Sequence, residues 1–183
     1  MFEVEQKYQV EKRLAVEERL LAFNAKIIGQ EVHEDVYYSH PSRDFRESGE
    51  ALRIRKVNGV PMVTYKGPRM PSKIKVRKEL EWRLDPGDAR GSQMAELLES
   101  LGFGKVAAVC KTRDVYRIPN REITVVLDQV DGLGCFAEIE RIAADEAQIE
   151  LAKQAIEELE SRLGLEKKES RSYLGMILEL PNR

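Results

Sequence analysis

Charged side chains alternate with apolar ones along several segments of this 183-residue chain, and their types suggest metal and phosphate chemistry. Carboxylates recur at Glu3 and Glu5 and again at Glu138 and Glu140. Carboxylate oxygens on neighbouring strands suit hard divalent cations such as Mg²⁺ and Mn²⁺. Guanidinium and ammonium groups suit phosphate oxygens, and arginine binds them through two parallel hydrogen bonds. The sequence therefore offers ligands for both a metal ion and a phosphate compound.

Residues two apart in a strand point to the same side, so the alternation assigns the ionisable residues to one face of each strand, the charged face. The acids on this face are Glu3, Glu5, Glu79, Glu81, Asp128, Glu138 and Glu140. The bases are Lys7, Arg53, Arg55, Lys66, Lys75, Arg77, Lys111 and Arg113. Eight bases against seven acids leave a net charge of +1, which two divalent ions would raise to +5. A triphosphate, at about −2 on its terminal group and about −1 on each other phosphate, nearly offsets that charge.

A single strand of this kind would also fit an antiparallel sheet with one solvated face. Solvated faces usually mix Ser, Thr, Gln and Lys, whereas here like charges stand two residues apart, as at Arg53 and Arg55. The alternate faces are apolar and would pack beneath helices, so we expect the charged faces to turn inward. An eight-stranded barrel has room for one small ligand. We therefore predict an α+β fold, a closed antiparallel β-barrel of about eight strands with helices packed on the outside.

The elements that must position these residues follow from periodicity. Alternation predicts strands over 2–8, 36–39, 51–57, 61–66, 73–84, 111–118, 121–128 and 136–142. Helical spacing predicts helices over about 10–25, 88–101 and 144–163 and a short one over 173–178. The Asn58-Gly59 pair indicates a hairpin turn, so the sheet should be largely antiparallel. We expect Trp82 to pack beneath a helix, and His33 and His40 to lie on the surface.

Composition narrows the classes of function. Thirty basic residues against 32 acidic ones give a formal charge of −2, so general nucleic-acid binding is not expected. No stretch approaches the roughly 18 apolar residues of a membrane span, so we expect a cytoplasmic protein without a membrane partner. A chain of this length usually forms one domain.

Six motifs stand in the order found in a known family: ExExK at 3–7, LRIR at 52–55, TYKGP at 64–68, a basic-then-acidic strand at 77–81, KTR at 111–113, and Leu127-Asp128 leading into FAEIE at 136–140. The sequence thus resembles the CYTH superfamily of triphosphate tunnel metalloenzymes. That family includes class IV adenylyl cyclases, thiamine triphosphatases and inorganic tripolyphosphatases. The resemblance covers nearly the whole chain, which implies a single CYTH-like domain over residues 1–183.

The resemblance implies a closed tunnel and a role for each matching residue. Two Mg²⁺ or Mn²⁺ ions would be held by Glu3, Glu5, Asp128, Glu138 and Glu140. The triphosphate would be bound by Lys7, Arg53, Arg55, Lys66, Arg77, Lys111 and Arg113. The candidate catalytic residues are Glu5, Lys7, Lys111 and Arg113. Glu79 and Glu81 are expected in the tunnel with less defined roles, and Lys75 is assigned by alternation alone.

Three functions remain open at this point. Neither a Walker A sequence nor a nucleophilic triad occurs, so phosphoryl chemistry would rely on metal and basic groups. The first hypothesis is an adenylyl cyclase, a phosphorus–oxygen lyase that converts ATP to cyclic AMP and pyrophosphate, because 40–45, 50–55 and 127–140 are similar to the bacterial cyclase branch. The second is a hydrolase of tripolyphosphate, thiamine triphosphate or a nucleotide. The third is a non-catalytic binding module, which would gain nothing from seven acids. The sequence leaves the oligomeric state open, with a homodimer as one option.

Overall fold

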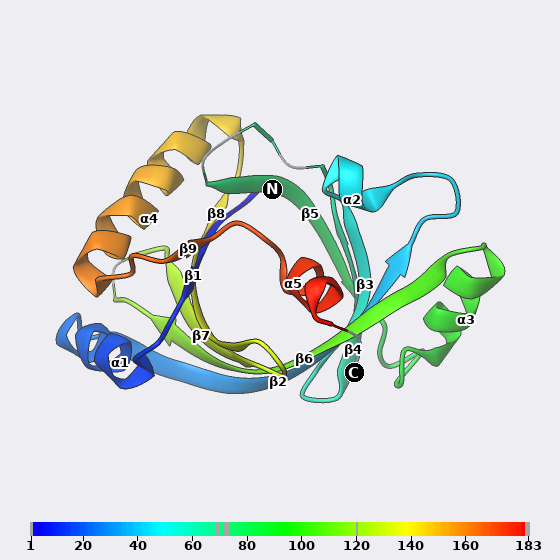
Figure 1. Cartoon of the computed structure of the whole chain (residues 1–183), viewed down its shortest axis with the longest axis horizontal. Coiled ribbons are helices and arrows are strands. Elements are labelled where there is room, and N and C mark those ends of the chain that lie inside the picture. Colours follow the sequence, from blue (N-terminus) through cyan, green and yellow to red (C-terminus); the bar gives the residue numbers. More distant parts are fainter. Residues whose placement is uncertain (1, 69, 72–73, 120, 182–183) are drawn as a thin grey trace. The chain divides into compact units, whose positions relative to one another are not determined.

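The computed structural model describes residues 2–68, 70–71, 74–119 and 121–181, and within them nine strands join in one sheet (Figure 1). The strands are β1 (Phe2–Gln9), β2 (Lys26–Ser39), β3 (Ala51–Val57), β4 (Val60–Lys66), β5 (Lys75–Arg83), β6 (Gly104–Arg117), β7 (Thr124–Val130), β8 (Gly134–Ala143) and β9 (Lys168–Glu169). They hydrogen-bond in the order β5-β4-β3-β2-β6-β7-β8-β1-β9, and β5 also pairs with β1. This last pairing closes eight strands into the predicted antiparallel β-barrel, and β9 pairs with β1 beside the ring.

Two strands are much longer than the sequence indicated. The strands β2 and β6 begin at Lys26 and Gly104, whereas alternation placed their starts at 36 and 111. Residues 26–35 and 104–110 lack the clean charged-apolar alternation of the other strands, so pairing with neighbours determines their extended form. The other predicted strands end within three residues of the observed ones, although residue 73, where one was expected to begin, lies outside the described residues. The two-residue β9 is too short to give a periodic signal.

The helices are α1 (Arg13–Ala22), α2 (Phe45–Ser48), α3 (Ser92–Ser100), α4 (Ile149–Leu163) and α5 (Tyr173–Glu179), and the 3-10 turn η1 (Glu146–Gln148) precedes α4. The four predicted helices are confirmed with somewhat different ends. The single turn α2 was not predicted, because four residues are too few to show a helical stripe. Its ends are well defined: the side chain of Asp44 accepts from the backbone N–H of Arg46, and Gly49 takes a left-handed conformation.

The chain divides into two compact units. The first unit comprises Met1–Glu31, Met70–Arg77 and Thr112–Ser170, and the second comprises Val32–Arg69, Lys78–Lys111 and Arg171–Arg183. The strands β2, β5 and β6 contribute residues to both units.

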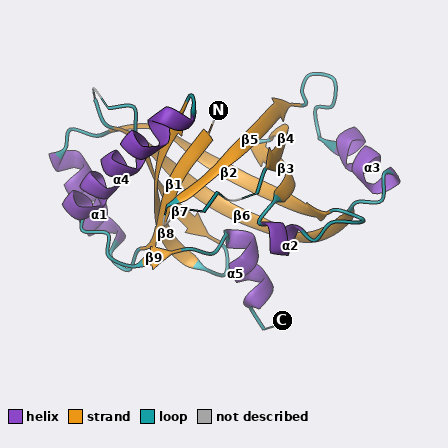
Figure 2. Ribbon diagram, turned by 90° about the horizontal axis from the view of Figure 1, so that it is seen from above, coloured by secondary structure: helices purple, strands orange, loops and turns teal. Residues whose placement is uncertain are grey.

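In the first unit, α4 packs on β8 and β1 and lies beside α1 (Figures 1 and 2). Val4 and Ile139 from the strands share a buried core with Ile156, Leu159 and Leu163 from α4. Because strand residues alternate, the charged residues next to Val4 and Ile139 point away from these helices. Glu3, Glu5 and Glu138 are nevertheless buried, and Glu140 is half-buried.

The second unit is built in the same way. Leu98 of α3 packs with Tyr38, Leu52, Ile54 and Val63 from β2, β3 and β4. Arg53 and Arg55 alternate with Leu52 and Ile54 and so point away from α3. The charged face of this unit is therefore also opposite its helix.

Three expectations about individual side chains were wrong or incomplete. Trp82 is 56% exposed, so it is not buried beneath a helix as expected. His33 is only 2% exposed, because it lies in the part of β2 that alternation did not identify. His40 is half-buried, with its ring near Phe45 and Phe103. None of the described helices has the length and apolar content needed to span a membrane.

Candidate functional site

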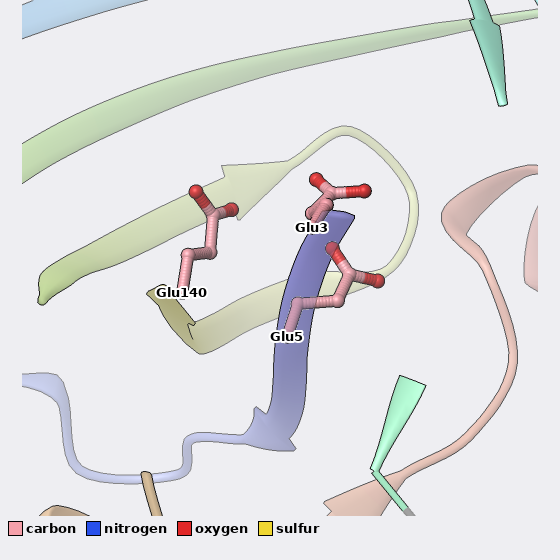
Figure 3. A group of neighbouring side chains, drawn as sticks. All are labelled: Glu3, Glu5 and Glu140. Atoms are coloured by element: carbon pink, nitrogen blue, oxygen red, sulfur yellow. The ribbon is translucent and has the colours of Figure 1, made fainter. Parts of the chain in front are cut away.

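Three carboxylates of the first unit converge at the β1–β8 pair (Figure 3). Glu3 and Glu5 share one face of β1, and the register places Glu140 of β8 directly opposite Glu5. One oxygen from each of the three side chains lies within 4.8 Å of the other two. Oxygen ligands gathered in this way suit Mg²⁺ or Mn²⁺, so the donor set fits the predicted metal.

The protonation of this group depends on its surroundings. Burial raises the pKa of Glu140 to about 8, and the nearby charges of Glu138, Glu3 and Glu5 add to the rise against the opposing effect of Arg113. The carboxyl of Glu140 therefore keeps its proton to a higher pH than an ordinary glutamate does. A divalent cation would compete with that proton, because a metal ligand must be deprotonated.

Arg113 is the main counter-charge in the first unit. Its Nε and Nη2 donate to the two oxygens of Asp128, each at 2.7 Å. Its Nη2 also donates to Glu138, and its Nη1 lies 3.4 Å from Oε1 of Glu140. Sequence analysis assigned Arg113 to the phosphates. In this structure it binds three of the predicted metal ligands.

The other bases of the first unit also lie beside carboxylates. Nζ of Lys7 is 3.7 Å from Glu138, and Nζ of Lys75 is 3.3 Å from Glu5. Arg77 lies 3.6 Å from Glu3 and 3.7 Å from Glu5. These residues form what we call the acidic cluster: Glu3, Glu5, Lys7, Lys75, Arg77, Arg113, Asp128, Glu138 and Glu140. Five acids against four bases leave it at −1 when all are ionised, which favours a cation.

The second unit carries a group with the opposite balance, which we call the basic cluster: Asp35, Tyr37, Arg53, Arg55, Lys66, Glu79 and Lys111. Nζ of Lys66 lies 3.0 Å from Glu79, and Nζ of Lys111 lies 5.0 Å from the ring centre of Tyr173. An ammonium group over an aromatic ring is attracted by the negative face of the ring. Four bases against two acids give this cluster a charge of +2, which favours an anion.

Asp35 is the residue of this site that sequence analysis missed. The predicted strand began at 36, because the charged Glu34 interrupts the alternation just before it; the one remaining signal was that Asp35 shares a face with Tyr37. Asp35 lies directly opposite Arg55 in the β2–β3 register. Although burial opposes ionisation, the charges of Arg53, Arg55 and Lys111 hold the pKa of Asp35 well below its ordinary value. Asp35 adds an acid that was not predicted, while the predicted acid Glu81 is exposed, so the charges of the two clusters, −1 and +2, still sum to the expected +1.

Glu81 lies apart from both clusters. Its side chain is exposed and accepts a hydrogen bond from Oγ1 of Thr64 at 2.8 Å. Glu79, two residues earlier in β5, contacts Lys66 and belongs to the basic cluster. Of the predicted residues, the structure thus brings nine together in the first unit and five in the second.

Two arginines have a donor without an acceptor. Nε of Arg53 and Nε of Arg77 are buried and make no hydrogen bond within the described part of the chain. A buried donor left unsatisfied costs about 1–3 kcal/mol, and more when the group is charged. Each unit therefore has one buried guanidinium group that an incoming oxygen atom could satisfy.

Comparison with known proteins agrees with this arrangement. The family model of the CYTH domain matches residues 1–173. Adenylate cyclase CyaB of Aeromonas hydrophila is 31% identical over 177 residues, which cover 94% of this chain and 86% of that protein. A Pyrococcus horikoshii protein of known structure is 39% identical with a TM-score of 0.86, over 97% of this chain and 98% of that one. A Hippeastrum protein with a dominant triphosphatase activity shares the fold at 19% identity and a TM-score of 0.68, over 97% of this chain and 94% of that one.

Proposed function

The chain belongs to the CYTH family, and from this membership we propose that it is a metal-dependent enzyme that acts on a triphosphate compound. One observation carries the proposal: Glu3, Glu5 and Glu140 converge within 4.8 Å in a cluster that also contains buried bases. A protein that only bound anions would gain nothing from three converging carboxylates of this kind, because together they repel phosphate and are expensive to bury.

In this proposal the acidic cluster holds the divalent cations through Glu3, Glu5 and Glu140, with Asp128 and Glu138 as further ligands. When bound, Mg²⁺ or Mn²⁺ would polarise the phosphate oxygens and offset the charge that develops during the reaction. Arg113 would then exchange its carboxylate partners for phosphate oxygens. Its five donors in a planar fork suit either partner.

Each cluster contains basic residues that suit phosphate oxygens. In the first unit these are Lys7, Arg77 and Arg113, and in the second they are Arg53, Arg55, Lys66 and Lys111. The buried Nε donors of Arg53 and Arg77 support this assignment, because phosphate oxygens would supply the acceptors they lack. Lys75, which contacts Glu5, would keep the carboxylates ionised.

Adenylyl cyclase activity is the reaction we propose first. The 3′-hydroxyl oxygen of ATP would attack the α-phosphorus and lose its proton to solvent, the bond from the α-phosphorus to the oxygen that bridges to the β-phosphorus would break, and pyrophosphate would leave. Similarity to the cyclase of Aeromonas hydrophila along nearly the whole chain supports this choice. Buried arginines near the phosphates would stabilise the charge on the departing pyrophosphate.

Hydrolysis is the second candidate. Water would attack the terminal phosphorus of tripolyphosphate, thiamine triphosphate or a nucleotide, the bond to the bridging oxygen would break, and orthophosphate would be released. The fold shared with the Hippeastrum triphosphatase supports this alternative.

The products distinguish these reactions. Purified protein is incubated with Mg²⁺ or Mn²⁺ and separately with ATP, tripolyphosphate or thiamine triphosphate, and the products are resolved by chromatography. We expect cyclic AMP and pyrophosphate from ATP, and no product in excess EDTA. Orthophosphate as the sole product would replace the cyclase with a triphosphatase. Binding of triphosphates without any turnover would leave a binding module and refute the enzyme.

A further inference from the structure

Asp35 is the acid around which the basic cluster is arranged. Its Oδ1 accepts a hydrogen bond from Nε of Arg55 at 2.6 Å, and its Oδ2 accepts one from Nη2 of Arg55 at 2.6 Å. Two parallel charge-assisted hydrogen bonds fix both the position and the plane of a guanidinium group. Arg55 is therefore held in one orientation, with two of its three nitrogens occupied by Asp35.

Arg53 contacts the same carboxylate more loosely. Its Nη1 lies 3.4 Å from Oδ2 of Asp35 and 3.3 Å from the hydroxyl oxygen of Tyr37, and its Nη2 lies 4.0 Å from Glu79. The remaining nitrogen, Nε, is buried and has no acceptor in the described chain. Buried donors without an acceptor are rare in folded proteins and call for an explanation.

We propose that Asp35 is a positioning residue for phosphate binding: it immobilises Arg55 and orients Arg53 so that Nε of Arg53 donates to a phosphate oxygen. This inference rests on the proposed function, because it needs a phosphate compound at the basic cluster. It also gives different roles to Arg53 and Arg55, which alternation in the sequence places on the same face. Arg53 donates to the phosphate through its buried Nε, whereas Arg55, besides any phosphate contact, supports the carboxylate that orients Arg53.

A simple counter-ion would have the opposite effect. A negative charge beside two arginines weakens their attraction for an anion, so its removal should strengthen phosphate binding on charge alone. A positioning residue predicts weaker binding after the same change. In Asp35→Asn the amide can accept only one of the two hydrogen bonds from Arg55, because its NH₂ group faces another donor whichever way it turns. The sign of the change in affinity therefore decides between the two roles.

The test is calorimetric titration of tripolyphosphate in excess EDTA, so that binding is measured without turnover. The proteins are the wild type, Asp35→Asn, Arg53→Ala and the double variant. We expect Asp35→Asn to bind about tenfold more weakly or worse, as for loss of a charge-assisted hydrogen bond. Arg53→Ala should lose at least as much. The double variant should bind no more weakly than Arg53→Ala, because Asp35 acts through Arg53.

Glu50→Gln is the matched control. Glu50 is also a buried acid of the second unit, but its partners are Arg43, Ser48 and Tyr65, outside the basic cluster. It should bind tripolyphosphate like the wild type. Asp35→Glu provides a second variant should Asp35→Asn fail to fold by circular dichroism. It keeps the charge but moves the carboxylate by one methylene, so it should also weaken binding.

The outcomes separate the positioning role from the proposed function. If the wild type binds and either Asp35 variant binds as tightly or more tightly, the positioning role is wrong while the proposed function stands. If the losses in Asp35→Asn and Arg53→Ala multiply in the double variant, Asp35 does not act through Arg53. If the wild type does not bind tripolyphosphate in EDTA, the positioning role is wrong, whereas the proposed function is tested separately by turnover with Mg²⁺ or Mn²⁺.

Discussion

Arg113→Met removes the charge that neutralises the carboxylates of Asp128, Glu138 and Glu140 and keeps most of the side-chain length. The side chain of Arg113 is 10% exposed, and that of its partner Asp128 is fully buried. Removing one partner of a buried ion pair costs about 3–5 kcal/mol, because the other partner is left as an uncompensated charge. The total free energy of unfolding of a domain is about 5–15 kcal/mol. We therefore expect a melting temperature lower by roughly 6–20 °C, at about 2–4 °C per kcal/mol for this chain length.

The loss of stability in Arg113→Met should increase with pH. Without Arg113, the remaining carboxylates have a higher pKa in the folded protein than the roughly 4 of the unfolded chain. A carboxyl group whose pKa is higher in the folded than in the unfolded protein destabilises the folded state at pH values above the unfolded pKa. This destabilisation disappears once the pH falls below the unfolded pKa. The variant should therefore lose more stability at about pH 8 than at about pH 5.5.

Urea unfolding followed by circular dichroism at both pH values measures this effect. Arg121→Met is the control, because Arg121 pairs with Glu158 of the same unit while both side chains are substantially exposed, 35% and 45%. Its loss should stay below about 1 kcal/mol. Our reasoning is refuted if Arg113→Met is no less stable than this control, or if its loss is larger at the lower pH.

Two further predictions concern the metal and a helix end. Because the pKa of Glu140 is raised to about 8, Mn²⁺ binding should release a proton and tighten from about pH 6.5 to about pH 8.5. Calorimetry in buffers of different ionisation enthalpy measures the release, and a pH-independent affinity would contradict it. Gly164→Ala should lower the free energy of unfolding by about 1–2 kcal/mol, because Gly164 ends α4 in the left-handed conformation, with φ 62°. The new Cβ would also lie 1.8 Å from Nη1 of Arg19, which donates to the carbonyl of Leu163. Thermal unfolding should show this loss of stability. Gly29→Ala is the control and should lose much less, because a Cβ at Gly29 would meet no atom within 4 Å.

Much of the fold could be predicted because the strands alternate ionisable and apolar residues, a pattern that each strand shows by itself. At Leu52 to Arg55, for example, four residues suffice to separate the helix-covered face from the charged face. The first part of β2 has no such pattern, and its extended form depends on pairing with distant strands. Asp35 was lost with that segment.

The pairing of charges could not be predicted in the same way. Alternation places Glu5, Glu140 and Arg113 on charged faces, but only the register of distant strands puts Glu140 opposite Glu5. Three-dimensional packing likewise decides that Arg113 meets carboxylates before any phosphate is bound. The exposed Trp82 shows that alternation cannot predict burial by itself, because an apolar residue on the apolar face of a strand need not be covered by a helix.

The most direct test of the central claim is turnover by Glu5→Gln, because Glu5 is placed among the ligands of the catalytic metal ion. Release of pyrophosphate and orthophosphate is measured with Mg²⁺ or Mn²⁺ and with either ATP or tripolyphosphate, beside the wild type and Glu122→Gln. Glu122 is the control because its side chain is 88% exposed and pairs with Arg141. We predict that Glu5→Gln stays folded and loses at least about a hundredfold in rate, while the control keeps its activity. A folded Glu5→Gln protein with near-wild-type turnover would contradict the metal site at these carboxylates.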